Sequence, residues 1–129
     1  MKTLIFDTET SGLPSSYRAS FSDIHVWPRI VEIAWIVFDI NLAPVSSSSF
    51  IVRPDDFQIS PGASSVHGIT TEMAKEKGSP LRYVLACLAE DLSDTDLLVA
   101  HNIDFDFPVV NCEFLRANMP STLGVKQKY

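Results

Sequence analysis

The sequence predicts one α/β domain built around a mixed β-sheet, and three observations support this fold class. The chain has 129 residues, which suffices for one domain, and 46% of them are hydrophobic, which suffices for a core. Apolar β-prone runs and helical apolar patterns follow one another in the order βββααβα. The first three strands have hairpin-like spacing, which predicts an antiparallel meander within the mixed sheet.

Four apolar segments are predicted to form the strands. Thr3–Phe6 is short and β-prone, and a polar turn follows it. Ile30–Phe38 is almost entirely apolar, which is typical of a buried strand covered on both faces. Ser48–Val52 and Leu97–Ala100 complete the set. Between the first two strands, Leu13–Trp27 contains several serines and no clear period, which indicates a surface loop.

Three segments are predicted to form helices. The first is short, with Thr70 as its cap and Gly78 as its stop. Ser79 caps the second helix, and a proline follows at its first position. The apolar face of this helix consists of Leu81, Val84, Leu85, Leu88 and Leu92. The third helix is predicted over Asp106–Asn118, with a proline in its first turn, and the polar tail Ser121–Tyr129 has no pattern.

Charge and cysteine content restrict the classes of function. The net charge of −6 argues against a broad electrostatic clamp on nucleic acid. It does not exclude a nucleic-acid enzyme whose carboxylates hold cations, because the cations reverse the local charge. Cys87 and Cys112 both fall on predicted helices, so we expect buried free thiols and a cytoplasmic, reducing compartment. No signal peptide or membrane-length apolar run is present, so no membrane partner is expected.

The most informative segment is Asp7-Thr8-Glu9. Residues two apart in a strand point to the same side, so both carboxylates would face one point beyond a buried strand. Like charges this close raise each other's pKa unless a cation lies between them. Ligand sets made only of oxygen suit Mg²⁺ or Mn²⁺. A solvated acidic turn is the commoner explanation for an isolated Asp-x-Glu.

A second polar segment, His101–Asp106, also follows a buried strand, at the point where the next helix begins. Ligand sites in α/β sheets form at the carboxyl ends of strands, so Asp106 is well placed to join Asp7 and Glu9. Helix capping is the alternative role for Asp106. Asp104 could cap the helix equally well, which would leave one of the two aspartates free for other work.

Together these segments resemble the DEDDh (DnaQ-like) 3′→5′ exonuclease superfamily, which includes proofreading epsilon subunits of DNA polymerase III. Phe6–Leu13 resembles its first motif and Val99–Asp106 its second. Pro28–Trp35 resembles its second strand, and Val66–Thr70 resembles the segment before its first helix. These matches occur in the family's order and extend to about Asn118.

The resemblance implies a ribonuclease H-like mixed sheet with flanking helices and hydrolysis of phosphodiester bonds from a 3′ end. Two cations, Mg²⁺ or Mn²⁺, would lie about 3.5–4 Å apart. Asp7 would bridge both cations, Glu9 would bind the first and Asp106 the second. The implied partners are the 3′ end of single-stranded DNA or RNA, the nucleoside monophosphate product and, for a proofreading role, a polymerase.

The resemblance also implies a set of substrate-binding residues around the terminal nucleotide. They are Thr8, Thr10, Leu13, Val66, His67, His101, Asn102 and Phe105. For His67, a hydrogen bond that fixes a loop is an equally favoured role. For Thr10 and Leu13, turn formation and core packing are the alternatives, and they are compatible with substrate contact.

The sequence departs from the family at its third motif, His-x4-Asp, which supplies the general base and a further metal ligand. Only His101 has this spacing, and its partner Asp106 is already needed for the second motif. We therefore expect residues 1–129 to form one exonuclease domain that is truncated at its C-terminus, without the last strand and helix. Feeble activity, and self-association at the edge near Leu97–Ala100, are expected to follow. The competing hypothesis is a non-catalytic module that binds a cation, a nucleic-acid end or a protein partner.

Overall fold

The computed structural model, which describes residues 1–129, contains a five-stranded mixed sheet in the order β3-β2-β1-β4-β5. The strands are β1 (Thr3–Thr10), β2 (Ile30–Phe38), β3 (Pro44–Ile51), β4 (Leu97–Val99) and β5 (Gln127–Lys128). The first three pair antiparallel, whereas β4 pairs parallel with both β1 and β5. The predicted mixed sheet with an antiparallel meander is therefore confirmed.

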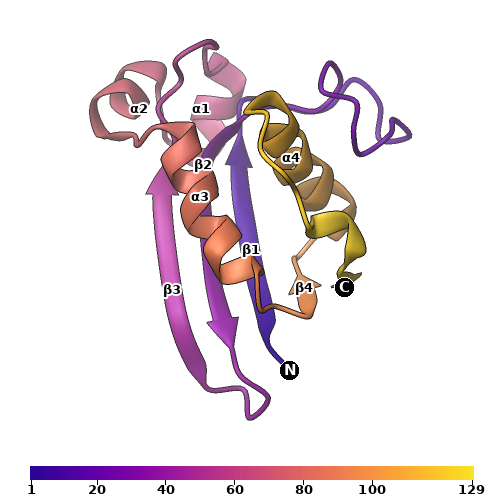
Figure 1. Cartoon of the computed structure of the whole chain (residues 1–129). Helices are drawn as coiled ribbons and strands as arrows, with labels where there is room; N and C mark the ends of the chain where they lie inside the picture. The colour runs from indigo at the N-terminus through magenta and orange to yellow at the C-terminus, as the bar shows by residue number, and fades with distance from the viewer.

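The helices cover only one face of this sheet. They are α1 (Pro61–His67), α2 (Thr71–Lys77), α3 (Leu81–Leu92), α4 (Ile103–Arg116) and the 3₁₀ turn η1 (Leu123–Val125). In Figure 1, α3 and α4 lie across the same face, while α1 and α2 lie beyond one end of the strands. The opposite face carries no helix, and we call it the open face.

Strand β1 alternates between the two faces along its whole length. Leu4 and Phe6 are buried on the helix-covered side, whereas Ile5 is 42% exposed on the open face. The prediction of a polar turn directly after Phe6 is wrong, because β1 continues to Thr10. The residues after Phe6 pair with β2, from Asp7 opposite Ala34 onwards, so a strand partner overrides their polar character.

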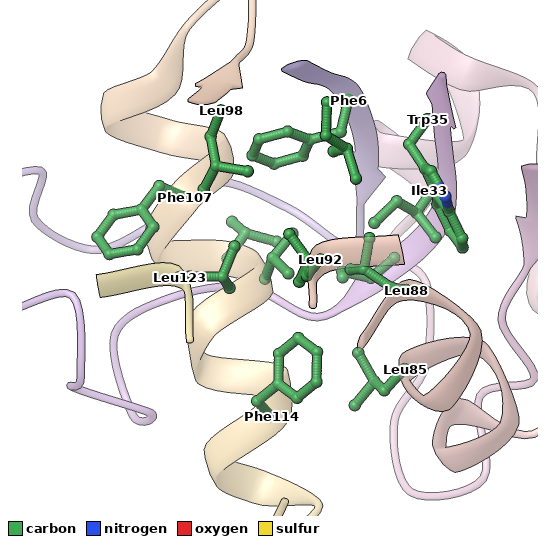
Figure 2. Packing of buried hydrophobic residues seen from close by; sticks show 14 of the residues in the cluster. Phe6, Ile33, Trp35, Leu85, Leu88, Leu92, Leu98, Phe107, Phe114 and Leu123 are labelled. Atoms are coloured by element: carbon green, nitrogen blue, oxygen red, sulfur yellow. The ribbon is translucent and has the colours of Figure 1, made fainter. Parts of the chain in front are cut away.

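The main core lies between the sheet and helices α3 and α4 (Figure 2). Its members include Phe6, Ile33, Trp35, Leu85, Leu88, Leu92, Leu98, Phe107, Phe114 and Leu123, which Figure 2 labels. Strand β2 has the predicted bounds, but it is not covered on both faces. Ile33 and Trp35 are buried, whereas Ile36 is 40% exposed, because nothing packs on the open face.

The helices before α4 agree with the prediction only in part. Helix α1 is not predicted, although Ser60 caps it by accepting a hydrogen bond from the Ala63 N–H at 3.1 Å. Helix α2 is capped by Thr70, as predicted. Ser79 does not cap α3, because its backbone bonds to Ile51 and Arg53 and so continues the β3 edge.

Helix α4 begins at Ile103, earlier than the predicted start at Asp106. Asp104 and Asp106 therefore both lie inside its first turns, and neither caps it. Asn102 occupies the cap position without a side-chain hydrogen bond. Pro108 lies within the helix rather than in its first turn.

The C-terminal segment is ordered into the sheet, so the prediction of a patternless tail is wrong. Turn η1 buries Leu123, and β5 pairs with β4. The pairing extends to the last residue, since the Tyr129 N–H donates to the Leu98 carbonyl at 2.8 Å. Strand β4 is therefore covered, and the expected self-association at this edge loses its basis.

The two cysteines are free, as predicted. Cys112 on α4 is buried, and burial raises the pKa of its thiol to about 11. Cys87 on α3 is only half-buried, which differs from the expectation of two buried thiols. None of the helices has the length and hydropathy that crossing a bilayer requires.

Candidate functional site

Asp7 and Glu9 project from the open face of β1, two residues apart as the motif predicts. Asp7 is exposed and Glu9 is half-buried. Burial raises the pKa of the Glu9 carboxyl, and the charge of Asp7 raises it further. An ionised pair in this position is therefore electrostatically unfavourable without a positive charge nearby.

Asp106 approaches the same strand from α4. Strand β4 ends opposite Ile5, so the edge of β1 beyond Ile5 is free to accept another partner. There the Oδ1 atom of Asp106 accepts hydrogen bonds from the Thr8 hydroxyl at 2.7 Å and the Thr8 N–H at 3.3 Å. Thr8, whose side chain lies on the opposite face of β1 from Asp7 and Glu9, thereby fixes the orientation of the Asp106 carboxylate.

Asp106 is only 4% exposed, so its carboxylate is largely shielded from solvent. Backbone N–H groups of Thr8 and Asn102 both stabilise the ionised form of this carboxylate. Burial raises the pKa of Asp106, the Thr8 hydroxyl opposes this, and the charge of Asp7 raises it again. Asp106 is therefore within electrostatic range of Asp7.

The three carboxylates do not form a group tight enough to hold a cation as they stand. Asp106 is tied to the edge of β1 by Thr8, whereas Asp7 and Glu9 extend from the open face. Their chemistry nonetheless suits a divalent cation, because the donors are all oxygens and two of them have raised pKa values. Their role as metal ligands stays a prediction.

A cavity of about 540 Å³ adjoins Glu9 between β1, α1 and the start of α4. Six of the predicted substrate-binding residues line it together with Glu9: Thr8, Thr10, Leu13, Val66, His67 and Phe105. Of the other two, His101 lines a shallow hollow with Asp7 on the open face, and Asn102 lines a different cavity. The structure therefore brings most of the predicted set to one place.

The rim of this cavity exposes two apolar side chains. Leu13 is 80% exposed and Val66 is 82% exposed, and they come from the β1–β2 loop and from α1. Such exposure differs from the core-packing alternative for Leu13. Apolar side chains at the mouth of a cavity are suited to contact the flat face of a base.

His67 and Thr10 shape the cavity wall through hydrogen bonds. The His67 Nδ1 accepts from the Ile69 N–H at 3.1 Å, so Nε2 carries the proton and donates to the Thr10 carbonyl at 3.0 Å. The loop-fixing role for His67 is thus observed, and the same ring also lines the cavity. The Thr10 hydroxyl donates to the Gly12 carbonyl at 2.7 Å, which is the turn-forming alternative.

Glu113 is a supporting residue that the sequence patterns did not identify. Its side chain is fully buried and accepts hydrogen bonds from Arg29 Nε at 2.8 Å, Arg116 Nη1 at 2.9 Å and the Ile30 N–H at 2.9 Å. The backbone of Arg29 in turn bonds to Ser11, next to the cavity rim. An acidic residue among the apolar residues of α4 was the available signal, since carboxylates are rarely buried unless paired.

Comparison with protein families gives one match, to the RNase_T exonuclease model, over residues 4–127. Among curated proteins, none matches the chain. The fold is also found in solved structures of Escherichia coli Exonuclease I, which confirms the ribonuclease H-like arrangement. For its complex with a dT13 oligonucleotide the TM-score is 0.74 at 23% identity, over 99% of this chain and 27% of that one.

Two further structures of the same enzyme give similar values. The metal-free form of its single-stranded DNA complex matches with a TM-score of 0.78 at 23% identity, over 99% of this chain and 27% of that chain. The zinc-bound form matches with a TM-score of 0.78 at 22% identity and the same coverage. The chain therefore spans about a quarter of the length of these structures.

Proposed function

Because the chain belongs to the RNase_T exonuclease family, we propose that it forms the 3′-end-binding and metal-binding part of a 3′→5′ exonuclease acting on single-stranded nucleic acid. The observation that carries this proposal is that Glu9 lines a cavity of about 540 Å³ together with six of the predicted substrate-binding residues, while Asp106 is bonded to Thr8 in the wall of the same cavity.

In this proposal Asp7, Glu9 and Asp106 hold divalent cations, Mg²⁺ or Mn²⁺, through their free oxygens. When bound, such cations activate a water molecule and neutralise charge on the phosphate oxygens. Thr8 keeps one Asp106 oxygen engaged and so fixes the orientation of this carboxylate. The protein thus contributes fixed geometry before any substrate arrives.

The cavity would receive the 3′-terminal nucleotide. Leu13 and Val66 would contact its base from the two sides of the rim, and His67 would hold the wall in place through Thr10. Single-stranded DNA is the favoured substrate, because the structurally similar Exonuclease I complexes contain DNA oligonucleotides. A polymerase partner and a proofreading role stay predictions.

A second candidate function is binding of a 3′ end with little hydrolysis. Both ring nitrogens of His67 are engaged, so His67 cannot act as a general base. His101 adjoins Asp7, but no hydrogen bond orients its ring. Without an oriented base the rate should fall by about 10²–10⁴-fold.

The test uses a single-stranded oligonucleotide labelled at its 3′ end, with Mn²⁺, and measures binding and mononucleotide release together. We expect Mn²⁺-dependent binding and slow release, both lost in Asp7→Ala. The control is Asp55→Ala, which removes an exposed carboxylate paired only with Arg53. Binding that survives Asp7→Ala, or that is indifferent to a blocked 3′ end, would contradict the proposal.

A further inference from the structure

Four of the five arginines gather around one small cavity, although the chain as a whole has a net charge of −6. This cavity has a volume of about 220 Å³, and we call it the arginine cavity. The residues that line it are Arg29, Arg53, Asp55, Asp56, Leu81, Arg82, Arg116 and Ala117. It shares no residue with the cavity beside Glu9, which we call the first cavity. The three carboxylates and the substrate-binding set therefore leave it without a role.

The arginine cavity lies where four segments of the chain meet at one end of the sheet. Arg29 precedes β2, and Arg53 follows β3. Arg82 lies in the first turn of α3, whereas Arg116 lies in the last turn of α4. Figure 1 shows the start of α3 and the end of α4 at this same end of the strands. Phe105 lines the first cavity from the opposite end of α4, about 16 Å from Arg116 along the helix axis.

Two of these arginines share one buried carboxylate. Oε1 of Glu113 accepts from Arg29 Nε at 2.8 Å and from Arg116 Nη1 at 2.9 Å. Arg29 also donates through Nη1 to Asp56 at 2.8 Å. The side chains of Arg29 and Arg116 are only 16% and 14% exposed. Their guanidinium groups are thus fixed before any ligand arrives, which lowers the entropic cost of binding.

The other two arginines are more accessible. Arg53 pairs with exposed Asp55, from Nε to Oδ1 at 2.6 Å and from Nη2 to Oδ2 at 3.2 Å. Arg82 forms no ion pair, and Nη1, which donates to the Ala117 carbonyl, is the only one of its guanidinium nitrogens that is engaged. Four guanidinium charges thus meet three carboxylate charges around the cavity. An excess of positive charge remains in a chain that is otherwise acidic.

The size of the cavity and the arrangement of its donors favour one small oxyanion. A volume of about 220 Å³ exceeds the roughly 30 Å³ of a water molecule, but it lies below the roughly 300–1,000 Å³ of sites for larger ligands. The guanidinium groups come from four segments, so they can reach oxygens that point in different directions. A phosphate presents such oxygens, whereas both oxygens of a carboxylate lie in one plane. Arginine binds phosphate through charged and often bidentate hydrogen bonds.

We propose that the arginine cavity binds a single phosphate group, either inorganic phosphate or the phosphate of a small monoester. The unengaged guanidinium nitrogens of Arg53 and Arg82 would donate to its oxygens, and the charges of Arg29 and Arg116 would attract it from the buried side. The first turn of α3 lines the cavity without a side-chain cap and adds backbone N–H donors. The proposal does not depend on the proposed function, because no residue of the candidate site takes part.

The experiment titrates the metal-free protein with inorganic phosphate and follows the arginine Nε–H signals in proton–nitrogen correlation spectra. We expect saturable shifts for Arg29, Arg53, Arg82 and Arg116, and none for Arg18, which lies outside the cavity. Acetate at the same ionic strength should give much smaller shifts, because it lacks the tetrahedral oxygens. Shifts that grow without saturation, or that acetate reproduces, would overturn the proposal.

Arg82→Gln should raise the Kd for phosphate by about 10-fold or more, as expected for a lost hydrogen bond between charged groups. Arg53→Gln should have a similar effect, and it keeps the test decisive if Arg82→Gln does not fold. Arg18→Gln is the matched control, because Arg18 is also exposed and its loss changes the net charge equally. This control should leave the Kd unchanged. Equal weakening in Arg18→Gln and Arg82→Gln would show a response to net charge alone and overturn the proposal.

Two further titrants identify the source of the phosphate group. If the cavity accepts a monoester, thymidine 5′-monophosphate should shift the same Nε–H signals as inorganic phosphate does. Shifts with inorganic phosphate alone would assign the cavity to the free ion, and both results support a phosphate site. Shifts caused by thymidine, which has no phosphate, would overturn it. Neither titration bears on the proposed function, whose test depends on Asp7 and Mn²⁺.

Discussion

The two faces of the sheet are used for different purposes, and β1 contributes to both. On the helix-covered face, Leu4 and Phe6 join the core, whereas on the open face Ile5 is exposed and is followed by Asp7 and Glu9. The strand alternation therefore places stability and chemistry on opposite sides of one backbone. The carboxylates can approach one another at some electrostatic cost because the covered face supplies the free energy that holds the strand.

The largest difference between the faces should appear in a pair of truncations. Phe6→Ala should lower the free energy of unfolding by about 3–5 kcal/mol, because it empties a packed core. Ile5→Ala, in the neighbouring position on the open face, should cost about 1 kcal/mol or less. Chemical denaturation of both variants measures this. Equal losses would show that the open face is covered in solution.

A smaller effect is expected at Glu113, which links the covered face to the cavity rim. Glu113→Gln removes the charge that both Arg29 and Arg116 require, and should cost about 2–3 kcal/mol. Since Arg29 also bonds to Ser11, mononucleotide binding should weaken as well. Denaturation and titration of the same sample test the two effects. Lost stability with unchanged binding would show that Glu113 does not influence the cavity rim.

The smallest effect should be a gain. Asp7→Asn removes a charge that raises the pKa of Glu9, so it should raise stability at neutral pH by less than about 1 kcal/mol, since the pair is partly exposed and screened. Because the pKa of Glu9 is higher in the folded state than in the unfolded state, the folded state binds a proton at this carboxyl at a higher pH. Wild type should therefore gain stability from this group on acidification, and lose it again as pH rises through the raised pKa.

This gain should be smaller in Asp7→Asn, where Glu9 retains only the effect of burial as its main cause of shift. Melting temperatures of both proteins without divalent cations, recorded across the acidic range, provide the measurement. A loss of stability in Asp7→Asn would mean that Asp7 makes a favourable contact that the carboxylate repulsion does not explain.

Much of the fold could be predicted because it is recorded in side-chain patterns. The apolar run of β2 and the Thr70 cap of α2 are local signals, and both were predicted correctly. Strand β5 could not be predicted, because its pairing with β4 uses the backbone while its side chains are polar. Helix α1 has no buried residue, so only its ends signalled it, through the Ser60 cap, the proline that follows and Gly68 at the C-terminal end.

Two short motifs, whose spacing reflects a strand and a helix start, predicted Asp7, Glu9 and Asp106 as the candidate site, and their role as metal ligands stays a prediction. The bond between Thr8 and Asp106 joins residues 98 positions apart, and the contacts of the loop residues with α4 are also long-range. Such long-range contacts leave no periodic signal in a single sequence.

Paramagnetic broadening by Mn²⁺ tests most directly whether Asp7, Glu9 and Asp106 draw together around one cation, as the proposed function requires. We expect amide signals around these three residues, and that of Thr8, to broaden at low Mn²⁺ with weak affinity. Asp7→Ala should abolish the effect while the spectrum stays folded. Broadening that persists in Asp7→Ala, or that centres on Asp55 and Asp56, would contradict the claim.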